Sequence, residues 1–290
     1  MFLTQLVHGL TLGACYALIA LGYSMVYGII GLINFAHGDI YMLGSFFALY
    51  LTSVVKMKIA PAFLIAMGLT SLVGLVIERV AYKPLRRSGR LSPLISAIGV
   101  SIFLSTLLNM YMGPQTRGFP DVITELQVKL GEIVITTTQL YIVAMSIALM
   151  LLLRHIVMRT RVGQAMRACS WDREVASLMG INVDQIIALT FAIGSALAAA
   201  AGVMMGVYFN AWWPLMGFSA GIKAFTAAVL GGIGSIPGAM LGGVVLGLVE
   251  ILGSAYLQSS YRDAISFTIL IIVLLVRPSG LLGRKIEQKV

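Results

Sequence analysis

About nine apolar stretches follow one another along this chain, separated by short polar or basic segments. They lie near residues 5–30, 39–55, 60–80, 93–112, 138–158, 186–209, 222–234, 237–257 and 264–276. A helix needs about 20 apolar residues to cross a bilayer, and most of these stretches approach that length. All 8 prolines fall between the stretches or at their ends, where helices tolerate them. The pattern predicts an all-α polytopic membrane protein.

The composition excludes a water-soluble domain. Only 11% of the 290 residues are charged, whereas a soluble domain carries about 25%. In such a chain we interpret the net charge of +9 as a topology signal and not as a nucleic-acid surface. The N-terminal residues, MFLTQLVHGLTLG, lack a basic region, so we interpret them as the start of a span and not as a cleaved signal peptide.

Three clusters hold most of the 20 basic residues: Arg79, Lys83, Arg86, Arg87 and Arg90; Arg154, Arg159, Arg161, Arg167 and Arg173; and Arg277, Arg284, Lys285 and Lys289. Cytoplasmic loops are rich in Lys and Arg, so counting spans from these clusters places the N-terminus outside and the C-terminus in the cytoplasm. Residues 222–234 are short and contain several glycines. We therefore expect a single transmembrane domain over 1–290, with about nine membrane helices or seven plus a re-entrant hairpin.

Residues 28–44, GIIGLINFAHGDIYMLG, place Asn34, His37 and Asp39 between two apolar stretches. Polar groups are costly at membrane depth and usually mark a bend or a pathway. In one interpretation Asn34 and His37 cap two helices at a tight cytoplasmic connection, and Asp39 starts the next helix. In a second, the segment breaks a helix deep in the bilayer and lines the inner half of the translocation path. In a third, His37 titrates as part of a gate.

Two further features leave alternatives open. Gly231, Gly232 and Gly234 leave backbone groups approachable, so they either line the path or allow close packing between permease subunits. Glu250, in GLVEILG, either is a satisfied buried acid or serves with His37 in an ion- or proton-coupled secondary carrier. The sequence contains no GxxxxGK[ST], HExxH, CxxC or GxSxG motif, and its three histidines are far apart, so we expect neither an enzyme nor a metal site.

Residues 159–185 form the largest predicted cytoplasmic connection. Apolar residues there have the spacing of one face of a short helix: Trp171, Val175, Leu178 and Met179. Asp172 is expected near the start of this helix and Gly180 at its end. Such a helix either docks into a groove on a cytoplasmic partner or lies on the bilayer surface.

Three segments, in the same order, resemble the H-type permease subunit of the high-affinity branched-chain amino acid ABC importers. They are GYSMVYGIIGLINFAHGDIYMLGSF (22–46), RACSWDREVASLMGINV (167–183) and AVLGGIGSIPGAMLGG (228–243). The second is similar to the loop that importer permeases insert into their ATPases, E-A-A-x-x-x-G. Glu174, Ala176 and Gly180 match that pattern, but Val175 replaces one alanine and the proline that commonly follows is missing.

The resemblance implies a bacterial inner-membrane permease for leucine, isoleucine, valine or similar amino acids, without catalysis or a bound cofactor of its own. It implies a homologous second permease, two ATPase subunits that hold ATP and Mg, and a periplasmic amino-acid-binding protein. The residues implied in ATPase coupling are Arg167, Trp171, Glu174, Ala176, Leu178 and Gly180. Related permeases share these segments, so a urea or short-amide importer is an alternative.

Overall fold

The computed structural model describes residues 2–86, 88–89, 91–120, 123, 125–130 and 133–283. Arg87, Arg90, Arg284, Lys285 and Lys289 of the basic clusters lie outside these residues. The elements are α1 (Phe2–Ile30), α2 (His37–Ser53), α3 (Ile59–Ile77), the π-helix η1 (Glu78–Tyr82), α4 (Leu91–Met112), β1 (Gln127–Leu130), β2 (Ile133–Thr136), α5 (Thr137–Arg159), α6 (Arg161–Trp171), α7 (Arg173–Leu178), α8 (Val183–Tyr208), α9 (Met216–Gly231), α10 (Ile236–Tyr256), the 3-10 helix η2 (Ser259–Tyr261) and α11 (Arg262–Val276).

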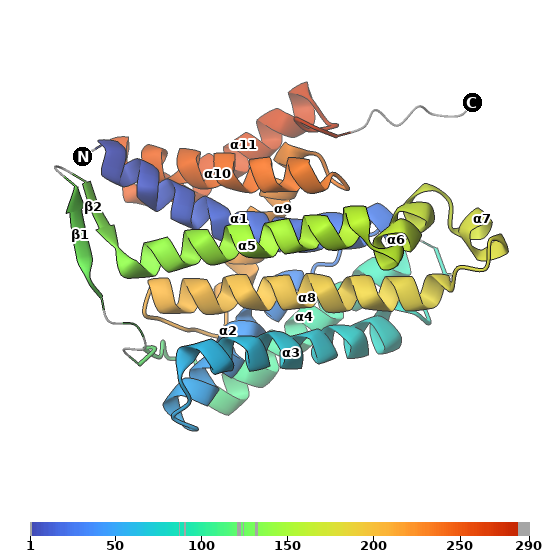
Figure 1. Cartoon of the computed structure of the whole chain (residues 1–290), viewed down its shortest axis with the longest axis horizontal. Helices are drawn as coiled ribbons and strands as arrows, with labels where there is room; N and C mark the ends of the chain where they lie inside the picture. The colour runs from blue at the N-terminus through green and yellow to red at the C-terminus, as the bar shows by residue number, and fades with distance from the viewer. Residues whose placement is uncertain are drawn as a thin grey trace.

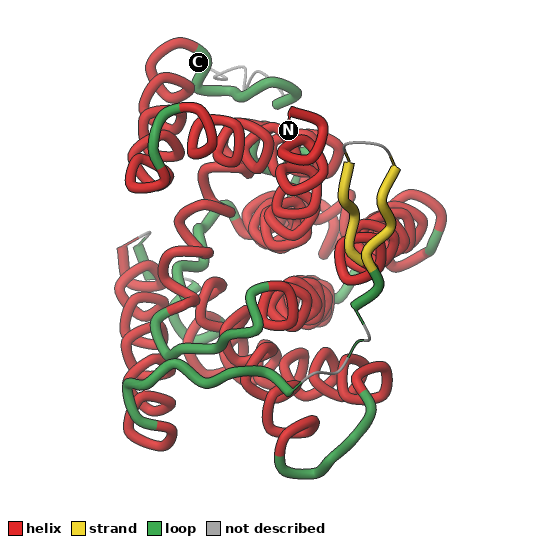
Figure 2. Tube along the Cα trace, turned by 90° about the vertical axis from the view of Figure 1, so that its left-hand side faces the viewer, coloured by secondary structure: helices red, strands yellow, loops and turns green. Residues whose placement is uncertain are grey.

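The long helices run roughly along one common axis (Figure 1). The antiparallel hairpin of β1 and β2 lies at one end of this axis, and α7 projects at the other. We call these the hairpin end and the α7 end. Viewed along the axis, the helices form a bundle with the hairpin on its rim (Figure 2).

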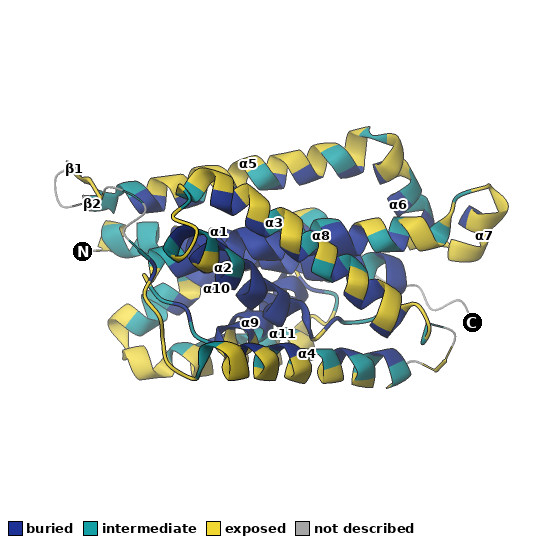
Figure 3. Cartoon of the chain, turned by 90° about the horizontal axis from the view of Figure 1, so that it is seen from below, coloured by how far each residue is buried: buried dark blue, intermediate teal, exposed yellow. Residues whose placement is uncertain are grey.

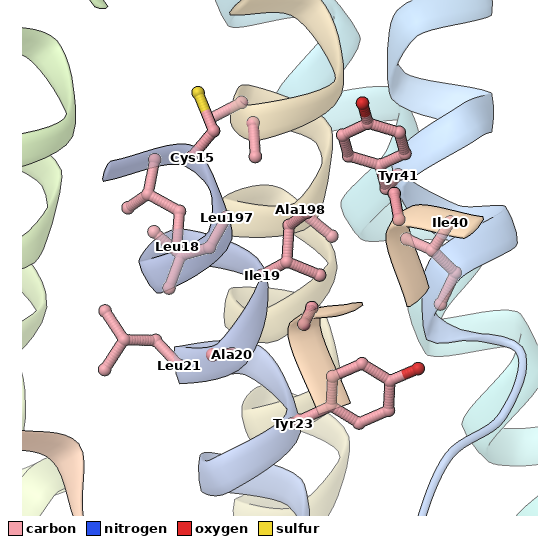
Figure 4. Close-up of a cluster of buried hydrophobic side chains, with 14 of the residues drawn as sticks. Cys15, Leu18, Ile19, Ala20, Leu21, Tyr23, Ile40, Tyr41, Leu197 and Ala198 are labelled. Atoms are coloured by element: carbon pink, nitrogen blue, oxygen red, sulfur yellow. The ribbon is translucent and has the colours of Figure 1, made fainter. Parts of the chain in front are cut away.

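Helix α1 is the centre of this bundle. Of its most apolar window 89% is buried, against 6% for the window that covers α11. Cys15, Leu18 and Ile19 are completely buried and pack with side chains of α2 and α8 (Figure 4). The outer helices α3, α4, α5 and α11 present exposed apolar side chains instead (Figure 3). Those faces suit lipid, because apolar side chains on the outside of a membrane bundle meet acyl chains.

Glycines allow a close contact between α1 and α10. A Cβ placed on Gly247 would lie 2.3 Å from the Cα of Gly13, and one on Gly243 would lie 2.4 Å from the Cα of Ala17. Small residues that let backbones approach closely are a common means of helix association in lipid. Gly243 and Gly247, one helical turn apart on α10, therefore serve packing within this chain.

Within the described residues, seven helices are long and apolar enough to cross a membrane, and α2 and α9 are shorter, at 17 and 16 residues. The second-last pair, which the sequence left open, consists of the short α9 and the full-length α10. Helix α9 begins six residues before the predicted 222–234 stretch, at Met216. The hairpin and α6 were not predicted, because neither contains a long apolar run.

Candidate coupling helix and buried polar segment

The connection over 159–185 contains two helices, one more than predicted. The Thr160 side chain caps α6 by accepting a hydrogen bond from the Gly163 N–H at 3.1 Å. The Arg167 guanidinium donates to the Val157 carbonyl oxygen, which ties α6 back to the end of α5. Burial raises the pKa of the Cys169 thiol on the packed face of α6, so this thiol is neutral near pH 7.

Helix α7 has the capping groups that the sequence predicts. The Asp172 carboxylate accepts hydrogen bonds from the N–H groups of Glu174 and Val175, at 2.8 and 3.1 Å. Gly180 follows the helix with φ of +83°, a conformation that favours glycine. Both predictions are confirmed, because each rests on a local backbone requirement.

The two faces of α7 differ in their exposure. Ala176 is buried, with 3% exposure, and holds the helix against the protein. Leu178 is 87% exposed, and Trp171, Val175 and Met179 are also exposed, so the apolar face that the spacing predicts points away from the rest of the chain. An exposed apolar face at the tip of a projecting helix suits contact with a partner or a membrane surface.

Ion pairs join the start of α8, directly after α7, to the end of η1. Asp184 accepts from Lys83 at 2.9 Å and from Arg86 at 2.8 Å. Arg86 also pairs with the buried Glu78 of η1. A cavity of about 1670 Å³ lies between these groups, α7 and the end of α1. These ion pairs therefore connect α7, through the start of α8, to η1.

The polar segment after α1 folds back into the molecule. Residues 31–36 are not helical, and α2 begins at His37. A Cβ on Gly22 would lie 2.2 Å from His37 Nε2, and one on Gly194 would lie 3.7 Å from His37 Cε1. Both glycines lie well inside their helices. The segment is therefore buried in the half of the bundle nearest α7, and its role as a helix connection, a path lining or a gate stays a prediction.

Asn34 and Asp39 shape this buried start of α2. The Asn34 side-chain oxygen accepts hydrogen bonds from the Ala36 N–H at 3.1 Å and from the Tyr82 hydroxyl at 2.9 Å. Asp39 is buried in the first turn of α2, where a carboxylate complements the helix dipole. Asn34 Nδ2 and His37 Nε2 have no hydrogen-bond partner in the part of the chain that the structure describes. Unpaired buried polar atoms are uncommon in folded proteins.

The glycine-rich segment turns the chain between α9 and α10. Gly232 and Gly234 have φ of +105° and +87°. A Cβ on Gly231 would lie 1.9 Å from the Gly238 carbonyl oxygen. The turn also accepts a hydrogen bond from the Leu282 N–H to the Gly231 oxygen, at 2.9 Å. These glycines serve a tight turn and close packing within the chain.

Glu250 is completely buried and fully paired. Its carboxylate contacts Lys223 of α9 at 2.9 Å and Arg262 of α11, and it accepts from the hydroxyls of Tyr16 and Ser266 at 3.2 Å each. The contacts found for Glu250 do not include His37, which packs against Tyr23 instead. Our sequence analysis missed Lys223. A single lysine within an apolar stretch is a signal of a buried, paired charge.

No group of three or more metal-ligating side chains occurs among the described residues. The two regions that the structure brings forward are thus the projecting α7 and the buried segment that leads into α2.

A family described as "Branched-chain amino acid transport system / permease component" matches residues 5–274. The high-affinity branched-chain amino acid transport system permease protein LivH of Escherichia coli K12 is 49% identical over 100% of this chain and 98% of its own length. The permease protein BraD of Pseudomonas aeruginosa has the same identity and coverage. A solved structure, PsaBC from Streptococcus pneumoniae in complex with Fab, gives a TM-score of 0.49 and 13% identity over 94% of this chain and 91% of that chain.

Proposed function

This chain belongs to the branched-chain amino acid transport permease family, and we propose that it is the permease subunit of an ATP-driven importer for leucine, isoleucine, valine or similar hydrophobic amino acids. The observation that carries the proposal is the 49% identity to two high-affinity branched-chain amino acid permeases along the whole chain. The seven apolar helices supply the membrane domain that such a subunit needs.

We place the α7 end in the cytoplasm. The described basic residues of all three clusters gather at that end, on η1 and the turn after it, on α5, α6 and α7, and on the segment after α11. Cytoplasmic segments next to spans carry the excess of Lys and Arg. The N-terminus then lies outside and the C-terminus inside the bacterial inner membrane.

In this arrangement α7 is the contact with a separate ATPase subunit that binds ATP and Mg. Its exposed apolar face, led by Leu178, suits a groove in a cytoplasmic protein. A homologous second permease, a second ATPase and a periplasmic amino-acid-binding protein complete the proposed system. Because ATP chemistry belongs to other chains, this chain needs no catalytic group.

The proposed coupling route runs from α7 to the buried polar segment. Force on α7 reaches the start of α8, passes through Asp184 to η1, and reaches Asn34 through Tyr82. The unpaired polar atoms of Asn34 and His37 support a place for this segment beside the translocation path, where an amino acid offers polar partners. Gly231, Gly232 and Gly234 would act on that path only through the turn that they form.

The test is uptake of labelled leucine by proteoliposomes that contain the complete complex and the binding protein. The proposal expects uptake that needs ATP inside the vesicle and persists when a protonophore removes the proton gradient. Uptake without ATP that collapses with the proton gradient would establish the secondary carrier instead. Preferred uptake of urea or short amides over leucine would establish the alternative substrate class.

A further inference from the structure

Three helix ends meet at the hairpin end of the bundle: the starts of α1 and α5 and the end of α8 (Figure 1). His8 Nδ1, on α1, lies 2.7 Å from the hydroxyl oxygen of Tyr208 on α8 and 2.9 Å from Nε2 of Gln139 on α5. The imidazole is half-buried, whereas Gln139 is only 2% exposed. One ring nitrogen therefore joins all three helices.

The capping box at the start of α5 fixes which way the Gln139 amide points. Its Oε1 accepts a hydrogen bond from the Thr136 N–H at 3.0 Å, and the Gln139 N–H donates to the Thr136 hydroxyl at 3.4 Å. Amide orientations are assigned from such partners, so the group that faces His8 is the NH2 donor. His8 Nδ1 must then be an acceptor, which requires the neutral imidazole with its proton on Nε2.

Protonation of His8 disturbs this arrangement at Gln139 and not at Tyr208. An imidazolium carries N–H groups on both ring nitrogens, so Nδ1 becomes a donor. The Tyr208 hydroxyl can rotate and accept from it. The Gln139 amide cannot adapt without loss: in its present orientation two donors would face each other, and after a flip the Thr136 N–H would lose its acceptor. Protonation therefore weakens the link between α1 and α5.

Few charged groups lie on the elements that surround His8. Helix α1 and strand β2 contain no Asp, Glu, Lys or Arg, and neither do residues 137–153 of α5 or 185–208 of α8. The one charged residue of α10 is Glu250, which is already paired with cations of α9 and α11. Among the described residues, these elements thus present no unpaired charge to the ring.

The remaining titratable groups near His8 ionise at higher pH. Tyr208 contacts the ring directly, and Cys15 lies two turns further along α1. A tyrosine ordinarily titrates near about pH 10 and a cysteine near about 8.5, whereas an imidazole titrates near about 6.5. Of these three groups, only His8 changes its charge between about pH 5 and 8.

We propose that His8 is an acid-sensitive latch, which in its neutral form holds the starts of α1 and α5 together and on protonation releases them. The proposed orientation places the hairpin end outside, so the half-buried ring exchanges protons with the outer solution. The link is complete above about pH 6.5 and weakens as the outer pH falls. Loss of one hydrogen bond should raise the released population about fivefold.

The consequence for transport rests on the proposed function. Release disfavours the arrangement of the outer helix ends that the structure shows, and a transport cycle needs its states to interconvert in balance. Acid on the outer side should therefore slow leucine uptake.

Double electron–electron resonance tests the latch in the complete complex, without leucine or ATP. Spin labels on Leu3→Cys and Tyr141→Cys, at exposed positions of α1 and α5, report the separation of the two helix starts. Cys15 and Cys169 are buried, so they should stay unlabelled. Between about pH 7.5 and about pH 5.5 the share of longer separations should rise about fivefold. An unchanged distribution would overturn the proposal.

Three variants in the labelled background identify the group that responds. His8→Asn offers an amide oxygen that can accept from Gln139 at either pH, so the shift should disappear. Gln139→Glu keeps a residue that suits the capping box, but its carboxylate pairs best with an imidazolium, so the shift should reverse. His155→Asn is the matched control, because His155 is exposed near the other end of α5, and it should leave the shift unchanged.

A shift that persists in His8→Asn would overturn the proposal, because another group would then carry the response. Greater separation in acid for Gln139→Glu would overturn it as well, since it would contradict the assigned donor.

Uptake tests the consequence for transport. In proteoliposomes with the interior buffered near neutral pH, external acid should slow leucine uptake about threefold more in the unchanged chain than in His8→Asn. Equal slowing in the two chains would overturn the role of the latch in transport. The distances are measured without transport, so the latch and the proposed function can fail separately.

Discussion

The Tyr82 hydroxyl donates a 2.9 Å hydrogen bond to the Asn34 side-chain oxygen, and both residues are buried. Tyr82 is the last residue of the π-helix η1, and its ring lies 5.0 Å from that of Phe191 on α8. Asn34 fixes the backbone that enters α2. This pair thus connects the helices behind α7 to the buried polar segment.

Replacement of Tyr82 by Phe removes this connection and little else. We expect the free energy of unfolding to fall by about 1 kcal/mol, the usual contribution of one hydrogen bond. Leucine uptake per ATP hydrolysed should fall while ATP hydrolysis by the complex continues. Tyr141→Phe, at an exposed position on α5, is the control. An unchanged ratio of uptake to hydrolysis in Tyr82→Phe would show that the pair has no part in coupling.

Gly217 and Gly38 bring the starts of α9 and α2 together. A Cβ on Gly217 would lie 2.5 Å from the Gly38 carbonyl oxygen. Gly217→Ala should therefore lower stability by about 1–3 kcal/mol through overpacking against rigid backbone. Gly99→Ala is the control, because a Cβ there meets open space. Thermal unfolding of the two variants in detergent measures the difference, and equal midpoints would contradict the packing.

The Glu250 cluster should stabilise the fold without carrying protons. Glu250→Ala leaves Lys223 buried with Asp263 as its remaining acid, at 2.8 Å, so we expect a loss of about 3–5 kcal/mol. Glu250→Gln keeps groups that can pair with Tyr16 and Ser266, and it should retain ATP-driven uptake. Glu125→Gln, at an exposed acid, is the control. A folded Glu250→Gln variant that abolishes uptake would assign the carboxylate a direct role in transport.

Charge and shape at α7 should matter for coupling. Glu174→Lys places a cation in the first helical turn, which disfavours the helix by about 0.3–1 kcal/mol. Gly180→Arg adds a bulky side chain at a position with positive φ. Both should uncouple ATP hydrolysis from leucine uptake while the protein still inserts. Gly180→Ala separates the effects, because it adds the backbone strain without the bulk. Unchanged coupled uptake in both charged variants would refute the role of α7.

Much of the fold follows from local signals in the sequence. Apolar runs of sufficient length predict the long helices. Proline and glycine at the ends of these runs predict the ends of the helices within a few residues. Asp172 and Gly180 predict the limits of α7 because a cap and a positive φ are properties of neighbouring residues.

The remaining features depend on contacts between distant residues. The hydrogen bond between Tyr82 and Asn34 joins two helices, and neither residue indicates its partner in the sequence. The buried depth of His37 depends on Gly22 and Gly194, on two other helices. The pairing of Glu250 with Lys223 similarly needs the short α9, whose start the hydropathy pattern places too late.

The most direct test of the account is the effect of Leu178→Asp on ATP-driven leucine uptake by the reconstituted complex. Leu178 is 87% exposed, so the change should leave folding intact, whereas burying a carboxylate in an apolar groove of the ATPase should cost at least about 2 kcal/mol. The matched control is Leu126→Asp, at an exposed leucine near the hairpin end. The account predicts that uptake falls more than about tenfold in Leu178→Asp and stays unchanged in Leu126→Asp. Full uptake by Leu178→Asp would contradict it.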